Sequence, residues 1–149
     1  MASKIKETKL GFELHPDLSR DGIHLGSFPL CQVLLINDSA YPWFVLVPQR
    51  ENIRDTVDLS DTDYHSLWAE SRAFSTAIMK LFGGEKLNVA ALGNITPQLH
   101  LHHVVRFSAD PAWPGPIWGV QPLTAYQDQQ IEEIRTRLAS ANIPGFSPQ

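Results

Sequence analysis

Polar and apolar residues alternate along QLHLHHVVRF, the stretch at positions 98–107. Successive side chains of a β-strand point to opposite faces, so this alternation predicts a strand with one face buried in a core. The predicted polar face carries Gln98, His100, His102 and Arg106, and the predicted apolar face carries Leu99, Leu101, Val105 and Phe107. Three of the chain's six histidines lie in this stretch, a concentration that core packing does not require. One histidine on a half-buried strand is usually an ordinary polar residue, but two on one face beside Gln and Arg favour a functional site.

Short apolar runs elsewhere predict further strands. Asn and Asp in the turn at residues 37–40 tolerate left-handed backbone conformations, so the two strands that flank this turn are expected to form an antiparallel hairpin. Residues 1–25 are polar and interrupted by glycine and proline, and only Phe12 and Leu14 indicate a short strand there. The predicted strands lie at residues 30–36, 41–47 and 87–92.

A long amphipathic helix is predicted at residues 61–82. Ser60 is a suitable N-cap, and the Gly83-Gly84 pair is a suitable C-terminal stop. Apolar side chains recur at steps of three and four residues, which places them on one face of a helix. These side chains are Tyr64, Leu67, Trp68, Phe74, Ile78, Leu81 and Phe82.

A stiff loop and a second helix are predicted after the histidine-rich strand. The loop at residues 110–119, DPAWPGPIWG, contains three prolines, two glycines and two tryptophans. Thr124 and Gln127 match a capping box, which predicts a helix that extends to about residue 141. The tail from Asn142 is expected to fray.

The order of these elements predicts an α+β fold, with a mostly antiparallel sheet of about five strands and the long helix and C-terminal helix packed on it. The chain has 149 residues, the size of one ordinary domain, so residues 1–149 are expected to form a single domain. Its core is expected at residues 26–107, followed by the C-terminal loop and helix at residues 108–141.

Composition narrows the class of partner. The net charge of −4 argues against a polynucleotide, which would need a basic surface, but does not exclude a small nucleotide. The single cysteine, Cys31, cannot form an internal disulfide and lies in an apolar run, so we expect a buried thiol in a cytoplasmic protein. Residues 1–10 have no apolar core of a signal peptide, and no apolar run is long enough to span a membrane.

The histidine row suits nucleophilic catalysis at phosphorus. A neutral imidazole attacks phosphorus and leaves it readily, and roughly three quarters of unperturbed histidines are neutral at pH 7. The attacking ring needs an acceptor on its other nitrogen and hydrogen-bond donors around the phosphate. Strand spacing and turn proximity place Gln98, His102 and Asn94 around His100 for these roles.

A metal site is the competing interpretation. His100 and His102 could share an ion, with a third ligand from His15, His24, His65 or an acidic residue. Gln is a poor zinc ligand, however, and the polar face of the strand carries no carboxylate. His103 points to the opposite face and is expected to be structural. Arg106 could contact a phosphate or form a salt bridge with Asp110.

These residues resemble the histidine triad (HIT) family. In its motif three histidines alternate with apolar residues before a short apolar run and an arginine, and QLHLHHVVR is similar to that pattern. LLIND at 34–38 and VLVPQR at 45–50 resemble the family's nucleotide-binding hairpin. The predicted helix at 61–82 and the strand at 87–92 follow in the family's order, so the resemblance covers roughly residues 28–107.

The resemblance implies that His100 is the nucleophile that attacks a nucleotide α-phosphate and is transiently nucleotidylated. It implies that His102 helps to bind the phosphate, that Asn94 lies in the turn before the motif, and that Asn37 contacts the ribose. The implied activity is that of a nucleotide hydrolase or nucleotidyl transferase, acting on a dinucleoside polyphosphate or a nucleoside phosphoramidate. A homodimer is implied, and neither a metal nor another cofactor.

Two positions depart from the family pattern. Gln98 replaces the first histidine of the motif, and Trp43 stands where many relatives have another histidine. Gln can donate and accept a hydrogen bond but cannot carry a proton charge, so proton transfer to the leaving group is in question. The alternatives are therefore a nucleotide-binding module with little turnover and a metal-dependent hydrolase that uses His100 and His102. Leu35, Trp43, Trp113 and Trp118 are the apolar residues proposed to stack on a base.

Overall fold

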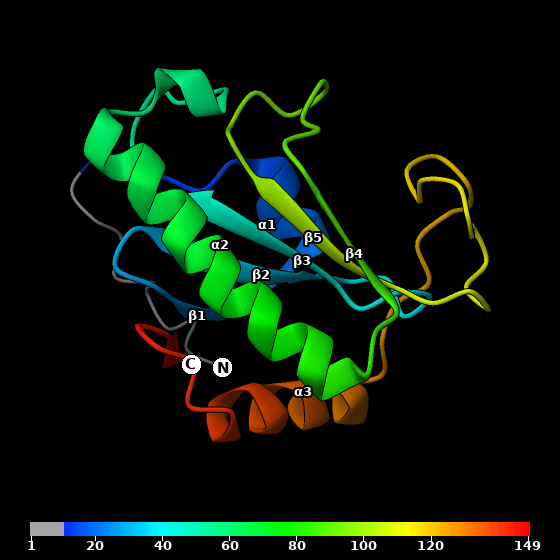
Figure 1. The fold of residues 1–149 in the computed structure, drawn as a ribbon. Helices are drawn as coiled ribbons and strands as arrows, with labels where there is room; N and C mark the ends of the chain where they lie inside the picture. The colour runs from blue at the N-terminus through cyan, green and yellow to red at the C-terminus, as the bar shows by residue number, and fades with distance from the viewer. Residues whose placement is uncertain (1–10) are drawn as a thin grey trace.

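The computed structural model describes residues 11–149. They form a six-stranded sheet with helices packed against it (Figure 1). The sheet has the strand order β4-β5-β3-β2-β1-β6, and every neighbouring pair is antiparallel. The α+β fold predicted from the sequence is confirmed. The strands are β1 (Gly22–Ser27), β2 (Cys31–Ile36), β3 (Trp43–Pro48), β4 (Lys86–Ala90), β5 (Leu101–Arg106) and β6 (Ser147–Pro148).

Three α-helices and one 3₁₀ turn complete the described part of the chain. They are α1 (Pro16–Asp21), η1 (Thr56–Asp58), α2 (Asp61–Phe82) and α3 (Asp128–Ser140). The predicted bounds and both predicted ends of the long helix are confirmed. The Ser60 hydroxyl accepts a hydrogen bond from the backbone N–H of Asp63, and Gly83 ends the helix in the left-handed conformation at φ 63°. No helix among residues 11–149 is long and apolar enough to cross a membrane.

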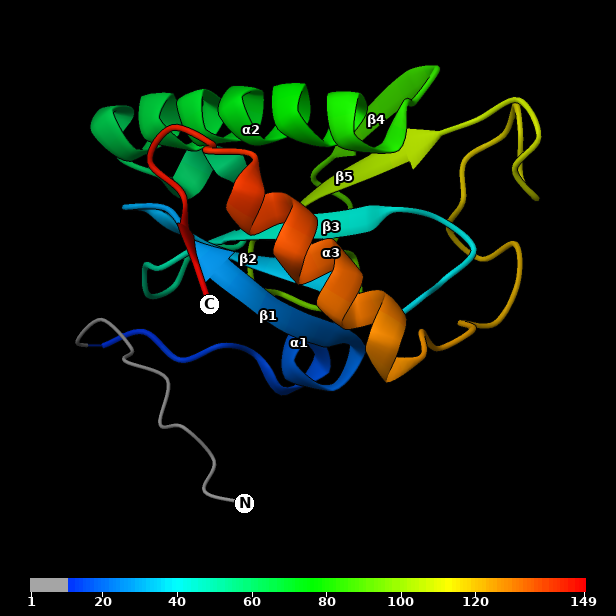
Figure 2. The same ribbon diagram turned by 90° about the horizontal axis from the view of Figure 1, so that it is seen from below.

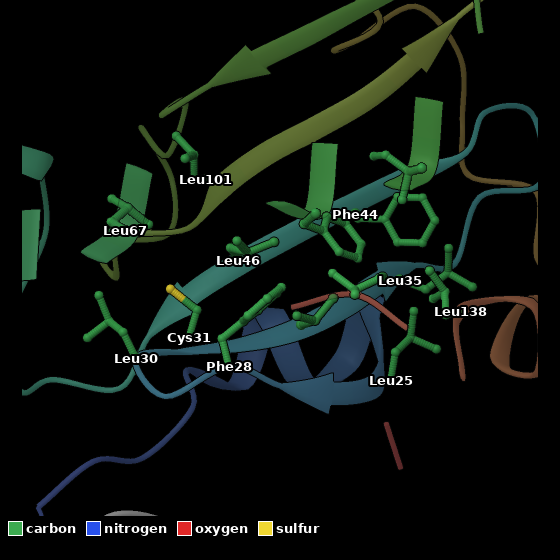
Figure 3. Close-up of a cluster of buried hydrophobic side chains, with 14 of the residues drawn as sticks. Leu25, Phe28, Leu30, Cys31, Leu35, Phe44, Leu46, Leu67, Leu101 and Leu138 are labelled. Carbon is green, nitrogen blue, oxygen red and sulfur yellow. The ribbon is translucent and has the colours of Figure 1, made fainter. Parts of the chain in front are cut away.

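Helix α2 covers one face of the sheet, and alternation along the strands buries one set of side chains beneath it. Phe44 of β3 and Phe74 of α2 lie at the centre, with ring centroids 5.2 Å apart. Figure 3 shows this cluster, including Cys31, which is buried as predicted. Each large side chain buried here contributes about 1.5–3 kcal/mol to stability. The cluster therefore fixes which face of β5 points toward α2 and which points away.

Helix α1 lies on the opposite side of the sheet from α2 (Figure 2). A second, smaller hydrophobic cluster forms there from residues 12–14, α1 and the faces of β2 and β3 that point away from α2. His102 lies on the strand face that alternates with the α2-facing residues, and therefore shares this side of the sheet. The members of the cluster are Phe12, Leu14, Leu18, Leu34, Ile36, Val45 and Val47.

Residues 11–27 are more regular than their sequence indicates. The strand expected around Phe12 and Leu14 is absent, and both side chains are buried from an irregular segment. Helix α1 and strand β1 follow it, in a region where glycine and proline gave no clear prediction. Pro16 starts the helix instead of breaking it, because proline is well tolerated in the first turn. The expectation about a signal peptide concerns residues 1–10, which lie outside the described residues.

The C-terminal part also differs from prediction in two places. The predicted capping box at Thr124 is wrong, because α3 has Gln127 as its N-cap and pairs it with Gln130. The tail expected to fray from Asn142 instead returns to the sheet. Ile143 is buried and β6 pairs with β1, so apolar contact far along the sequence orders the tail.

Candidate functional site

A cavity of about 460 Å³ opens at the start of β5, and both His100 and His102 line it. Residues 92–96, from the turn between β4 and β5, form one wall, and Trp118 and Gly119 of the proline-rich loop form another. A concave site of this size suits a small molecule. His100 lies one residue before β5, so the loop that precedes the strand positions it, and strand pairing positions His102.

The ring of His100 is held so that one nitrogen keeps a free electron pair. Its Nδ1 lies 2.7 Å from the backbone oxygen of Gln98. A carbonyl can only accept, so Nδ1 carries the proton and Nε2 is unprotonated. Burial lowers the pKa of His100, which favours the neutral ring. Gly93 packs against this ring, since a Cβ there would lie 2.9 Å from His100 Cε1.

Both nitrogens of His102 are engaged. The Trp43 indole donates to Nδ1 at 3.0 Å, and Nε2 lies 2.8 Å from the backbone oxygen of Leu92. An indole can only donate and a carbonyl can only accept, so the proton is on Nε2 and the ring is neutral. Burial first, and then a charge on His100, lower the pKa of His102 to about 4. The two imidazole centroids are 4.8 Å apart, so His102 supports the ring of His100 directly.

The proline-rich loop brings an indole to the cavity. Trp118 lies edge-on to His102 at 5.2 Å between ring centroids. Among residues 11–149 its buried Nε1–H has no hydrogen-bond partner, and the Trp118 side chain lines the cavity. The other apolar residues proposed to stack on a base lie elsewhere or support the histidines. Leu35 is buried in the core under α2, Trp43 donates to His102, and Trp113 lies under the Arg106 guanidinium.

The structure brings Asn94 to the cavity but not the side chains of Gln98 and Asn37. The Gln98 amide oxygen accepts from the backbone N–H of His15 at 2.8 Å, and its NH₂ donates to the backbone oxygen of Glu13 at 2.9 Å. The Asn37 side-chain oxygen accepts from a backbone N–H in the segment before α3, at 2.8 Å. Both amides therefore tie distant segments together.

The remaining polar residues of β5 are structural. His103 faces α2, where its Nε2 lies 2.7 Å from the Ser71 hydroxyl, and burial lowers its pKa to about 4. The structural interpretation of His103 is confirmed. Arg106 forms a buried ion pair with Asp110 at 2.7 Å, so the salt-bridge alternative holds for this residue. A hydrogen bond from Arg106 lowers the pKa of Asp110 to about 2, ahead of its other interactions.

The donor set at the cavity does not suit a shared metal ion. His102 has no free ring nitrogen, because Trp43 and Leu92 engage both. No group of three or more His, Cys, Asp or Glu residues converges within the described part of the chain. Two features of this region have no signal in the local sequence. Residues 13–17 bind to Gln98 and Thr96, and Trp118 returns to the cavity, through contacts between segments far apart in the sequence.

The HIT domain family model matches residues 19–109. A histidine triad protein of known structure from Marinobacter aquaeolei VT8 is 48% identical, with a TM-score of 0.85, and the match covers 87% of this chain and 95% of that chain. The histidine triad protein from Bradyrhizobium japonicum is 38% identical with a TM-score of 0.85, over 87% of this chain and 97% of that chain.

A third structure, the histidine triad (HIT) protein from Sinorhizobium meliloti 1021, is 38% identical with a TM-score of 0.86. The match covers 88% of this chain and 97% of that chain. A search of curated proteins gives no match.

Proposed function

Since this chain belongs to the HIT domain family, whose members are generally nucleotide hydrolases and transferases that bind small nucleotides, we propose that it cleaves a bond at the α-phosphate of a small nucleotide through a nucleotidyl-histidine intermediate on His100. The observation that carries this proposal is the protonation pattern of His100. Its Nδ1–H is held by the Gln98 carbonyl, which leaves the Nε2 electron pair available at the cavity.

The first step forms a bond between His100 Nε2 and the α-phosphorus. The bond from phosphorus to the leaving oxygen or nitrogen breaks, and its electron pair departs with the leaving group. In the second step water, or another nucleophile, attacks the phosphorus of the adduct. The N–P bond then breaks, and its electron pair returns to His100 Nε2.

Donors around the cavity support the charge on the phosphate. The Asn94 amide and the Trp118 indole both line the cavity and can donate hydrogen bonds. His102 keeps the ring of His100 in place, and the phosphate contact proposed for it requires its Nε2–H to leave the Leu92 carbonyl. Donors of this kind contribute about 3–4 kcal/mol each in oxyanion holes.

The substrate-binding roles predicted for Gln98 and Asn37 have to use other atoms than their side-chain oxygens, which are already hydrogen-bonded within the protein. Gln98 acts on the site through its backbone oxygen, because its side chain is bound to the N-terminal segment. A ribose contact by Asn37 would use its NH₂ group, since its oxygen already accepts from the backbone N–H of Tyr126. We propose dinucleoside polyphosphates and nucleoside phosphoramidates as the substrate classes, with Trp118 as the wall for the base.

We also propose a cytoplasmic homodimer. Strand β4 ends the sheet, so its outer edge presents backbone groups that a second copy could pair with. The lone cysteine suits a reducing compartment. Light scattering coupled to size-exclusion chromatography tests the dimer, and a mass near 16.7 kDa would contradict it.

The test of the activity uses a nucleoside phosphoramidate and a dinucleoside tetraphosphate, each with and without a chelator. We expect turnover, and a nucleotide adduct by intact mass that maps to His100 and survives chelation. His100→Ala should lose the adduct and at least about 10³-fold in rate while keeping the fold. His65→Ala, at an exposed position on α2, is the matched control and should retain both. Ligand protection without turnover would support a binding module, and loss of turnover on chelation a metal-dependent hydrolase.

A further inference from the structure

The N-terminal segment at residues 13–17 is fastened to the chain just before His100. The Gln98 side chain forms two hydrogen bonds with it, from the His15 N–H at 2.8 Å and to the Glu13 oxygen at 2.9 Å. The Thr96 hydroxyl, which belongs to the cavity wall, donates to the Asp17 carboxylate at 2.8 Å. These contacts hold the His15 backbone against Gln98, two residues before His100, and the Asp17 carboxylate against Thr96 of the cavity wall.

The ring of His15 has a partner for each of its protonation states. In the neutral ring, Nδ1 accepts from the backbone N–H of Asp17 at 3.1 Å, so the proton is on Nε2. In the charged ring, an Nδ1–H can turn to the Asp17 carboxylate, whose Oδ2 lies 3.7 Å away. The hydrogen bond from Thr96, the largest of several causes, lowers the pKa of Asp17, which keeps this carboxylate ionised.

His15 is also close enough to His100 to interact with it. After burial, the main cause, a charge on His15 lowers the pKa of His100. The His15 side chain keeps 31% of its surface exposed, so the ring is not sealed inside the protein. The charged groups near this ring also include Glu13 of the same segment and Arg20, which binds the Asp17 carboxylate at 3.3 Å and the Asp21 carboxylate at 2.9 Å.

The proposed reaction needs a proton that the histidine row does not supply. An amine or alkoxide leaving group must be protonated as its bond to phosphorus breaks. His100 is the nucleophile, and its remaining proton is bound to the Gln98 carbonyl. His102 is neutral with both nitrogens engaged, and Gln98 has no titratable group.

We propose that His15 is the proton donor to the leaving group, and that Gln98 positions it there in place of a histidine on the strand. This inference rests on the proposed function. As His100 Nε2 bonds to phosphorus, the departing atom takes its electron pair and receives the Nε2 proton of the His15 imidazolium. This transfer leaves a neutral His15 with its proton on Nδ1, the opposite tautomer to that of the resting ring. Its Nε2 then takes a proton from the attacking water as the N–P bond breaks, which restores the imidazolium and frees His100.

The test compares two substrates in a single turnover, so that only formation of the adduct is measured. One is a nucleoside phosphoramidate of an alkyl amine, which needs a proton to leave, and the other is a p-nitrophenyl nucleotide, whose phenolate leaves without one. The variant is His15→Asn, because Asn is also a good helix N-cap and keeps the structural role of this position. Adduct formation should fall about 10²–10⁴-fold with the phosphoramidate and change little with the p-nitrophenyl nucleotide.

The outcomes separate this inference from the proposed function. Equal losses with both substrates, or no loss with either, would overturn the role of His15 while leaving His100 as the nucleophile. Failure of the wild-type protein to form an adduct with the p-nitrophenyl nucleotide would overturn the proposed function and the inference together. The His65→Ala variant should match the wild type with both substrates, and the thermal midpoint of His15→Asn should show that its fold is retained.

Discussion

Acidification should destabilise this protein well before its carboxylates titrate, because burial holds the rings of His100, His102 and His103 neutral. The pKa of His102 and that of His103 are each lowered to about 4, in both cases mainly by burial. In the unfolded chain the same rings would take up a proton near pH 6.5. The depressed folded-state pKa values therefore contribute stability that is present above pH 6.5 and is lost as the pH falls toward 4.

The size of the effect follows from these two values. When the pH falls from 7.5 to 5.0, protonation of His102 in the unfolded chain lowers the free energy of unfolding by about 2 kcal/mol, and protonation of His103 lowers it by about the same amount. The two together lower it by about 4 kcal/mol. A loss of that size is a large part of the stability of a typical domain. The lowered pKa of Asp110, about 2, affects stability only at lower pH, so its contribution does not overlap with this window.

Urea unfolding followed by tryptophan fluorescence at several pH values measures this loss. His103→Gln removes one titrating ring, so the pH-dependent loss should shrink by about 2 kcal/mol even if the variant is less stable at every pH. Constant wild-type stability from pH 7.5 to pH 5.0 would refute the reasoning. So would a His103→Gln variant with the full wild-type pH dependence.

Two further predictions concern packing around the site. Asp110→Ala leaves the buried Arg106 guanidinium without its carboxylate and should lower the free energy of unfolding in urea by about 3–5 kcal/mol. Asp61→Ala, at an exposed position, should lower it much less. Similar losses in the two variants would contradict the importance of the ion pair. Gly93→Ala puts a Cβ 2.9 Å from the His100 ring, which should displace the proposed nucleophile. Single-turnover adduct formation should then be about 10²-fold slower. An unchanged rate would show that the position of the ring is not critical.

The sequence alone determined the features that depend on local periodicity. The helix at residues 61–82 was predicted with its Ser60 cap and glycine stop, because the apolar stripe and both end signals lie within one segment. Alternation along the histidine row likewise assigned His102 and His103 to opposite faces of one strand, and the structure confirms the buried position of His103. The α+β fold followed from the order of these elements.

The tertiary structure decided which residues surround His100. Gln98 belongs to the polar face in the sequence pattern, but it lies before β5, where alternation no longer holds, and its amide binds Glu13 and His15. Trp118 reaches the cavity only because its loop folds back over the sheet. Periodicity specifies the face of an element, whereas contacts between segments more than 80 residues apart depend on how loops return. One such contact, between Gln98 and His15, positions the proton donor that we propose.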